Sequence, residues 1–343
     1  MDACKLFAMK MQTRPAIRLL GLVLLMVVRL EAAPGYKHTL VGNPADVTTP
    51  TSGLLVLQGG GTDVDQNFVA MGEHSGGGDF VVIRASGTDA YNPYILDLCG
   101  CDSVATIVFK NRNASFEPFV IDTIRNAEAL FIAGGDQSDY VKLWKSTPIE
   151  GAIHHVAAKP APVGGTSAGM AILSEFVYSA MSNSSLTSEE GLLDPFHRDL
   201  TLDRDFLALP KLQGIITDQH LQERDRMGRT VAFLARLVKD GWTDEGRAIA
   251  ADRETALHVD PETGSAEVFT TPTHPTPFVY FLRTPGPPEL CEPETPLTYL
   301  NVSVYRIGPG GTFDIDEWQA TGGISYTLSA QDGVLTSSNG AIY

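Results

Sequence analysis

Six short apolar runs, separated by stretches with helical patterns, constrain this chain more than any other feature of its sequence. They lie between residues 53 and 240 and comprise Leu54–Leu57, Phe80–Ile83, Val104–Phe109, Leu130–Ala133, Pro162–Gly164 and Ile215–Thr217. Most of these runs are continuously apolar, as strands are when both faces of a sheet are covered. Apolar strands that alternate with helices predict an α/β fold with a doubly wound, mainly parallel sheet.

The sequence changes character after Gly246. Short runs rich in β-branched and aromatic residues follow, such as Ala266–Thr270, Phe278–Leu282 and Ser303–Arg306, and Gly and Pro separate them. We therefore expect an α/β domain over residues 34–246 and a mostly antiparallel, β-rich C-terminal portion over residues 247–343 that packs on it.

The first 33 residues have the pattern of a signal peptide. Basic residues up to Arg18 precede an apolar run over residues 19–28, and the small residues Ala32 and Ala33 follow. The apolar run is short for a membrane span. We expect a secreted protein, with a signal anchor as the alternative.

Secretion would affect the cysteines and three asparagines. Cys99, Cys101 and Cys291 remain after the segment is removed, which allows at most one internal disulfide and leaves one thiol. Glycosylation sequons begin at Asn113, Asn183 and Asn301, listed here because a secreted chain could carry glycans there.

Charge and motif content exclude several classes of function. The formal net charge is −16, so nucleic acid and anionic membranes are not expected partners. Cys99-Gly100-Cys101 has no nearby His or second Cys pair, so we expect no metal site there. The glycine-rich loop Gly59–Gly61 fits neither phosphate-binding motif, and we expect no cofactor. A close approach of this loop to the substrate or to a serine loop is the more plausible reading.

A serine stands at a strand-to-helix turn. Gly165–Gly169 fits the pattern G-x-S-x-G, a sharp turn that exposes the hydroxyl of Ser167 at the end of a sheet. The backbone N–H of Ala168, near a helix N-terminus, could face a developing oxyanion. The alternative is an ordinary turn of an α/β protein.

Two other predicted strands end in polar groups. His220 follows one of them, and Gly134–Gln137 follow another. Chemistry in open α/β sheets collects at the carboxyl ends of strands, so these residues can meet Ser167. The N–H of Gly135 and the amide of Gln137 could form an oxyanion hole or hold a substrate carboxylate.

Three arginines crowd the start of the helix that follows His220. Arg224, Arg226 and Arg229 lie where cations oppose the helix dipole, and function often explains such a placement. Guanidinium groups there would suit a substrate that bears a carboxylate. Pairing with Glu223 and Asp225 on a solvated face is the alternative.

Taken together, these segments resemble the cyanophycinase family of serine peptidases. The resemblance covers roughly residues 53–240 and rests on Gly134–Gln137, Gly164–Gly169, Asp218–His220, Arg224, Arg226, Gly228 and Arg229. It implies a flavodoxin-like sheet of the class I glutamine amidotransferase type. It also implies a serine–acid–histidine mechanism in which Ser167 is the nucleophile and His220 the general base.

The resemblance further implies a substrate site and an acid. The residues that match family positions lining the substrate site are Gln137, Asp218, Gln219, Arg224, Arg226 and Arg229. The family cleaves β-Asp-Arg isopeptide bonds, so we expect a peptide or isopeptide substrate with a β-aspartyl linkage. The family's acid lies between serine and histidine, where Glu189, Glu190 and Asp194 stand, and we choose Glu190.

Two other functions remain open. A secreted α/β-type esterase shares G-x-S-x-G, but that fold usually places its histidine near the end of the chain. His220 instead precedes the whole β-rich portion. A non-catalytic binding protein on a peptidase scaffold is the second alternative, which an intact nucleophile, base and oxyanion loop would disfavour. A homodimer is left open.

Overall fold

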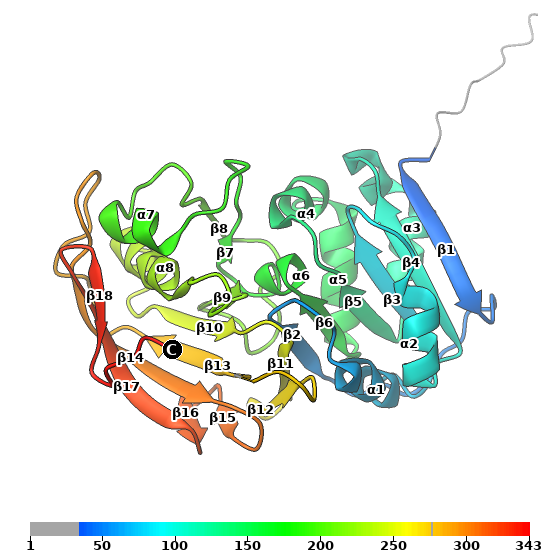
Figure 1. The fold of residues 1–343 in the computed structure, drawn as a ribbon. Coiled ribbons are helices and arrows are strands. Elements are labelled where there is room, and N and C mark those ends of the chain that lie inside the picture. Colours follow the sequence, from blue (N-terminus) through cyan, green and yellow to red (C-terminus); the bar gives the residue numbers. More distant parts are fainter. Residues whose placement is uncertain (1–33, 276) are drawn as a thin grey trace, which may run out of the picture. The chain divides into compact units, whose positions relative to one another are not determined.

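Five parallel strands form the middle of a ten-stranded sheet in the computed structural model, which describes residues 34–275 and 277–343 (Figure 1). Across the sheet they are β4 (Ser103–Phe109), β3 (Asp79–Arg84), β5 (Ala129–Ile132), β6 (Val163–Thr166) and β2 (Leu55–Gln58). Each strand overlaps one of the predicted apolar runs. The predicted α/β fold with a mainly parallel sheet is confirmed.

Helices cover both faces of this sheet. On one face, α1 (Asp65–His74) and α2 (Tyr91–Cys99) pack against a cluster that includes Val56, Phe80 and Phe131. The other face is covered by three helices, α3 (Pro118–Asn126), α4 (Gln137–Trp144) and α5 (Pro148–Ala158). Because successive side chains of a strand point to opposite faces, both sets must be apolar, which explains the continuous runs.

The strand order reverses direction between β3 and β5. The chain goes from β2 to β3 and β4, then returns to β5 and β6, so that β6 lies beside β2. In open α/β sheets, ligand sites form outside the carboxyl ends of strands near such a reversal. The outer edge beyond β4 is closed by β1 (Tyr36–Gly42), which pairs antiparallel to it.

The C-terminal portion is β-rich and mostly antiparallel, as predicted. One group of strands extends the first sheet beyond β2: β11 (Thr255–Val259), β12 (Ser265–Thr270), β15 (Thr312–Asp314) and β16 (Gln319–Thr321). A second, six-stranded sheet contains β10 (Arg247–Ala251), β13 (Val279–Arg283), β14 (Tyr299–Ile307), β17 (Ile324–Gln331) and β18 (Val334–Ser337). Its remaining strand is β9 (Ile215–Gln219), parallel to β10.

The placement of β9 differs from the simplest reading of the sequence, which put all six apolar runs in one sheet. A continuous apolar run indicates burial on both faces but does not identify the neighbouring strand. Here β9 pairs with β10, and the short helix α6 (Ala168–Ala171) contacts both β9 and β6. The two sheets therefore approach each other around α6 (Figure 1).

Five further elements complete the described part of the chain. They are η1 (Arg112–Phe116), β7 (Val177–Tyr178), α7 (Ser188–Leu193), β8 (Leu202–Asp203) and the apolar helix α8 (Met227–Lys239). Cys99 and Cys101 form a disulfide, and Cys291 is a buried free thiol. The predicted signal peptide, residues 1–33, lies outside the described residues. None of the described helices is long and apolar enough to cross a membrane.

We predict that Gly169→Ala destabilises the protein. A Cβ atom on Gly169 would lie 2.0 Å from the carbonyl oxygen of Ile132 on β5, and backbone cannot move aside cheaply. The free energy of unfolding should fall by about 3 kcal/mol, as in overpacked cores. The matched control is Gly151→Ala in α5, where a Cβ meets nothing within 4 Å.

That control should raise stability by up to about 1 kcal/mol through helix propensity. Urea unfolding followed by circular dichroism measures both changes. Equal stabilities of the two variants would contradict the close packing of α6 on β5.

Candidate active site

Ser167 occupies a strained turn between β6 and α6. Its backbone has φ 52° and ψ −118°, a conformation that few non-glycine residues adopt. The Ser167 N–H donates to the carbonyl oxygen of Gln58 on β2 at 3.0 Å. Its Oγ lies 3.1 Å from Nε2 of His220. The turn therefore presents the hydroxyl to the histidine that the sequence paired with it.

His220 comes from the second sheet, directly after β9. It is only 6 % exposed, and its φ is also positive at 50°. Its N–H donates to the carbonyl oxygen of Gly59 at 2.9 Å. A Cβ on Gly60 would lie 2.2 Å from Nε2 of His220. Gly60 therefore leaves the space that the imidazole fills, and the glycine-rich loop approaches the Ser167 turn and His220 directly.

The acid beside His220 is Glu223, not Glu190. Oε2 of Glu223 lies 2.7 Å from Nδ1 of His220. The carboxylate of Glu190 instead accepts hydrogen bonds from the N–H and Oγ1 of Thr187, as part of a capping box at the start of α7. Glu190 was selected because it lies between serine and histidine in the sequence. The tight turn after His220 instead brings the residue three positions later to the ring.

Burial and hydrogen bonding set the charges of this pair. Burial lowers the pKa of His220 below its usual 6.5, and the hydrogen bond to Glu223 only partly opposes that change. For Glu223, burial acts to raise the pKa, but the hydrogen bond to His220 and the nearby Arg224 outweigh it and leave the pKa lowered. The imidazole is therefore neutral and the carboxylate ionised at neutral pH, as a base and its orienting acid require.

Two backbone donors remain available next to Ser167. The N–H groups of Gly135 and Ala168 donate no hydrogen bond to any described residue. The turn at Gly134 is close to the serine, because a Cβ built there would lie 3.5 Å from Cβ of Ser167. Free N–H groups beside a nucleophile can stabilise the oxyanion of a tetrahedral intermediate.

A pocket of about 240 Å³ opens beside Ser167. The residues that line it are Gly135, Asp136, Gln137, Ser167, Tyr178, Ala180, Asn183, Ser184, Ser185, Gln219, Arg224, Arg226 and Arg229. Among the described residues, Arg224 and Arg226 form no ion pair with a carboxylate, although Arg226 is only 7 % exposed. Burial, with the nearby Arg229, lowers the pKa of Arg226 to about 10, so it is still a cation at neutral pH. The pocket thus offers two cations that form no salt bridge with a described carboxylate.

Asp218 and Arg229, expected at the substrate site, are occupied with each other. Nε of Arg229 donates to Asp218 Oδ2 at 2.9 Å, and Nη2 donates to Oδ1 at 2.5 Å. The same carboxylate accepts from Thr230 Oγ1 and from the N–H of Gln219. Burial acts to raise the pKa of Asp218, but Arg229 holds it below its usual range. Arg229 is part of the pocket wall, and its pairing with Asp218 holds that part of the wall in place.

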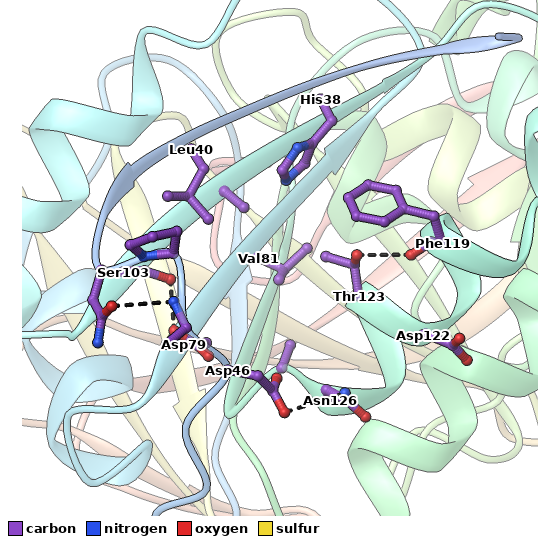
Figure 2. A pocket seen from close by; sticks show the side chains of 15 residues that line it. His38, Leu40, Asp46, Asp79, Val81, Ser103, Phe119, Asp122, Thr123 and Asn126 are labelled. Carbon is purple, nitrogen blue, oxygen red and sulfur yellow. Dashed lines mark hydrogen bonds between the residues drawn. The ribbon is translucent and has the colours of Figure 1, made fainter.

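A larger hollow elsewhere lacks this chemistry. Figure 2 shows a pocket of about 310 Å³ between β1 and α3. Its serine, Ser103, donates to Oδ1 of Asp79 at 2.6 Å, and Oδ2 of Asp79 accepts from the N–H of Val47. These polar groups satisfy one another and hold the strand edge in place. The candidate active site is therefore the smaller pocket.

Sequence reasoning missed the contact of Glu223 with His220. Glu223 appeared there only as a carboxylate that could neutralise the neighbouring arginines. The signal that could have found the contact is the position of Glu223 three residues after His220, in the short segment between the end of the predicted strand and the start of the next helix. That signal becomes specific only when the turn geometry is known.

Comparison with known proteins gives this geometry a family context. Residues 94–260 match the profile of peptidase family S51, and this segment includes Ser167, His220 and Glu223. No curated protein matches the chain at the same level of significance. The profile supports the expected family at the level of peptidase S51, and cyanophycinase activity itself stays a proposal.

Fifteen chains of solved structures match. One is a peptidase from an acI-B1 actinobacterium, 15 % identical, with a TM-score of 0.51, covering 77 % of this chain and 98 % of its own. Another is a Listeria monocytogenes protein provisionally described as peptidase E, 14 % identical, with a TM-score of 0.42, covering 64 % and 98 %. At such identities, the first match supports the fold alone.

Proposed function

Because the chain carries a peptidase family S51 domain over residues 94–260, we propose that it is a serine-type peptidase. Ser167 is the nucleophile, His220 the general base, and Glu223 the acid that orients the histidine. The observation that carries this proposal is the pair of short contacts on opposite nitrogens of His220, 3.1 Å to Ser167 Oγ and 2.7 Å to Glu223 Oε2. A nucleophile, a base and an orienting group that contact one another in this order form a catalytic relay.

The proposed reaction follows from these contacts. His220 Nε2 takes the hydroxyl proton as Oγ of Ser167 attacks the scissile carbonyl carbon, and Glu223 stabilises the imidazolium that forms. The N–H groups of Gly135 and Ala168 receive the oxyanion. His220 then gives its proton to the leaving amine, which breaks the C–N bond. A water molecule, deprotonated by His220, hydrolyses the acyl-enzyme and restores the serine.

We further propose that the substrate carries a carboxylate next to the scissile carbonyl, as a β-aspartyl linkage of the β-Asp-Arg type does. The support comes from Arg224 and Arg226, two pocket cations that form no salt bridge with a described carboxylate. A guanidinium can hold a carboxylate through paired, charge-assisted hydrogen bonds. An ordinary α-linked peptide presents a neutral amide at that place and leaves the cation unpaired.

The alternatives make different demands on the site. An esterase would need the same relay but no cation for an α-carboxylate, and a binding protein would need neither a short serine–histidine contact nor free N–H donors. The contacts of Ser167 and the unpaired arginines favour the peptidase. We also propose that the protein is secreted, in keeping with the Cys99–Cys101 disulfide, since oxidising compartments favour such bonds.

Ser167→Ala tests the nucleophile. Hydrolysis of a β-aspartyl dipeptide should fall by at least about 10³-fold, because no other hydroxyl contacts His220 among the described residues. A fluorophosphonate reagent should label Ser167 in the native protein and not in the variant, as mass spectrometry of the tryptic peptide would show. Circular dichroism controls for folding. Full turnover in the variant, with labelling elsewhere, would overturn the mechanism.

The pH dependence of kcat/KM tests His220 and Glu223. Only the neutral imidazole accepts a proton, so activity falls as pH drops through the pKa of His220. Because burial lowers that pKa, the acid limb should lie below pH 6.5. Glu223→Gln removes a group that raises the pKa of His220, so the acid limb of the variant's pH profile should move to lower pH. Its kcat should fall by roughly 10²–10⁴-fold.

Glu190→Gln is the matched control, since it removes the carboxylate that the sequence favoured. The acid limb of its pH profile should coincide with that of the wild type. A limb that shifts in Glu190→Gln and stays in place in Glu223→Gln would return the acid role to Glu190.

Substitution of the pocket arginines tests the substrate. Arg226→Gln and the exposed Arg224→Gln should each lower kcat/KM for a β-linked Asp-Arg peptide by roughly 10²-fold, the effect of losing a charged partner. Cleavage of the matched α-linked peptide should change less. Arg198→Gln, whose side chain is 87 % exposed and outside the pocket, is the control. Equal wild-type cleavage of the two linkages would refute the β-aspartyl assignment while leaving the serine mechanism intact.

A further inference from the structure

Three metal-ligating side chains gather outside the catalytic relay. Glu190 on α7 and His197 and Asp199 in the turn that follows it each bring one ligand atom to a common place, all within 4.8 Å of one another. The set combines one imidazole nitrogen with two carboxylate oxygens. No step of the proposed reaction uses any of them.

Asp199 is the unusual member of this cluster. The residue is only 5 % exposed, yet its carboxylate accepts no hydrogen bond from any described residue. The nearest cationic nitrogens are Nδ1 of His197 at 3.9 Å and Nε of Arg198 at 3.8 Å, both beyond hydrogen-bonding distance. Arg198 itself extends into solvent, with 87 % of its side chain exposed. A buried carboxylate that accepts no hydrogen bond is costly, and a bound cation would offset that cost better than these two long ion pairs do.

The other two ligands are already held in place. Oε2 of Glu190 accepts both hydrogen bonds of the capping box from Thr187, which fixes the side chain and leaves Oε1 without a partner. Nδ1 of His197 accepts only a long hydrogen bond, 3.3 Å from the N–H of Asp199, which the ring would give up to bind an ion through this nitrogen. One carboxylate oxygen from each acid and the imidazole can therefore converge without unfolding α7.

We propose that Glu190, His197 and Asp199 bind a divalent transition-metal ion, with Zn²⁺ as the best match. An imidazole nitrogen with two carboxylate oxygens suits Zn²⁺ better than Ca²⁺ or Mg²⁺, which prefer sets made only of oxygen. A water molecule would complete the tetrahedron. The sequence does not predict this site, because its only candidate metal motif is Cys99-Gly100-Cys101.

The site would fasten one wall of the catalytic pocket. Oγ of Ser188, at the start of α7, donates to the carbonyl oxygen of Asp225 and accepts from the N–H of Arg229. Ser184 and Ser185, just before α7, line the pocket. An ion that joins α7 to the turn at residues 197–199 therefore holds the segment between β7 and β8 together. This role is structural and does not depend on the proposed peptidase activity.

The test measures metal binding by the full chain. Protein stripped with EDTA is titrated with Zn²⁺, Mn²⁺, Ca²⁺ or Mg²⁺ in a calorimeter, and its Tm is recorded with each ion. We expect one equivalent of Zn²⁺ to bind and to raise Tm by about 4 °C at a free concentration of about one hundred times Kd. Ca²⁺ and Mg²⁺ should produce no such change.

Matched variants locate the ion. Asp199→Asn and His197→Ala should lose the Zn²⁺-dependent rise in Tm, and Glu189→Gln, an exposed neighbour on the same turn, should keep it. His220→Ala should also keep it, which excludes binding at the catalytic relay. If His197→Ala fails to fold, the near-isosteric Asp199→Asn decides. Absence of stoichiometric Zn²⁺ binding, binding that survives in Asp199→Asn, or a response to Ca²⁺ alone would each overturn the proposal.

Discussion

The buried ion pair between Asp218 and Arg229 is the interaction on which the site depends. It joins the end of β9 to the first turn of α8, and Nη1 of Arg229 also reaches Ser185 Oγ and the carbonyl oxygen of Leu186 in the pocket wall. Both side chains are almost completely buried, so removal of either partner would leave an uncompensated charge, which costs about 3–5 kcal/mol. The pair therefore fixes β9, α8 and the wall together, and His220 follows Asp218 by only two residues. The sequence predicts three equivalent substrate contacts from these arginines. In the structure, Arg229 pairs with Asp218 and holds the site together, whereas Arg224 and Arg226 face the pocket.

The catalytic groups meet at the junction of the two sheets. Ser167 follows β6 of the first sheet, His220 follows β9 of the second, and both have positive φ angles. The end of β2 holds both turns, since Gln58 accepts the N–H of Ser167 and Gly59 accepts that of His220. Strained backbone at a functional site persists only where the surroundings over-determine it. Here the two hydrogen bonds to β2, together with the space left by Gly60, supply that constraint.

Much of this arrangement follows from the sequence because burial and strand ends leave strong local signals. The apolar runs predicted the parallel strands, and the polar residues at their carboxyl ends predicted that Ser167, His220 and Gly134–Gln137 would meet. The strand with which a given strand pairs is not determined by its local sequence, which is why the sequence assigned β9 to the first sheet. The same reason hides Glu223, whose role depends on a turn with positive φ at His220. Nor could the sequence tell which arginine would pair with Asp218, because several cations lie within one turn of α8.

The unpaired arginines give the pocket a character opposite to that of the chain. The protein has a net charge of −16, yet beside Ser167 two cations face the pocket without a salt bridge to a described carboxylate. A pKa of about 10 keeps the buried Arg226 charged at neutral pH, so the free protein carries a desolvated cation whose cost the nearby Asp218, already paired with Arg229, offsets only in part. A substrate carboxylate would gain the attraction of that cation and also remove its desolvation penalty, whereas a neutral amide would do neither. The same interaction thus supplies affinity for one linkage and discrimination against the other, since specificity is a difference between two binding free energies.

Discrimination of this kind needs the cation to be buried and held in place before the substrate arrives. The Arg226 side chain meets that condition, because its Nη1 donates to the carbonyl oxygen of Gln219 at 2.9 Å and it lies against the fixed pair of Asp218 and Arg229.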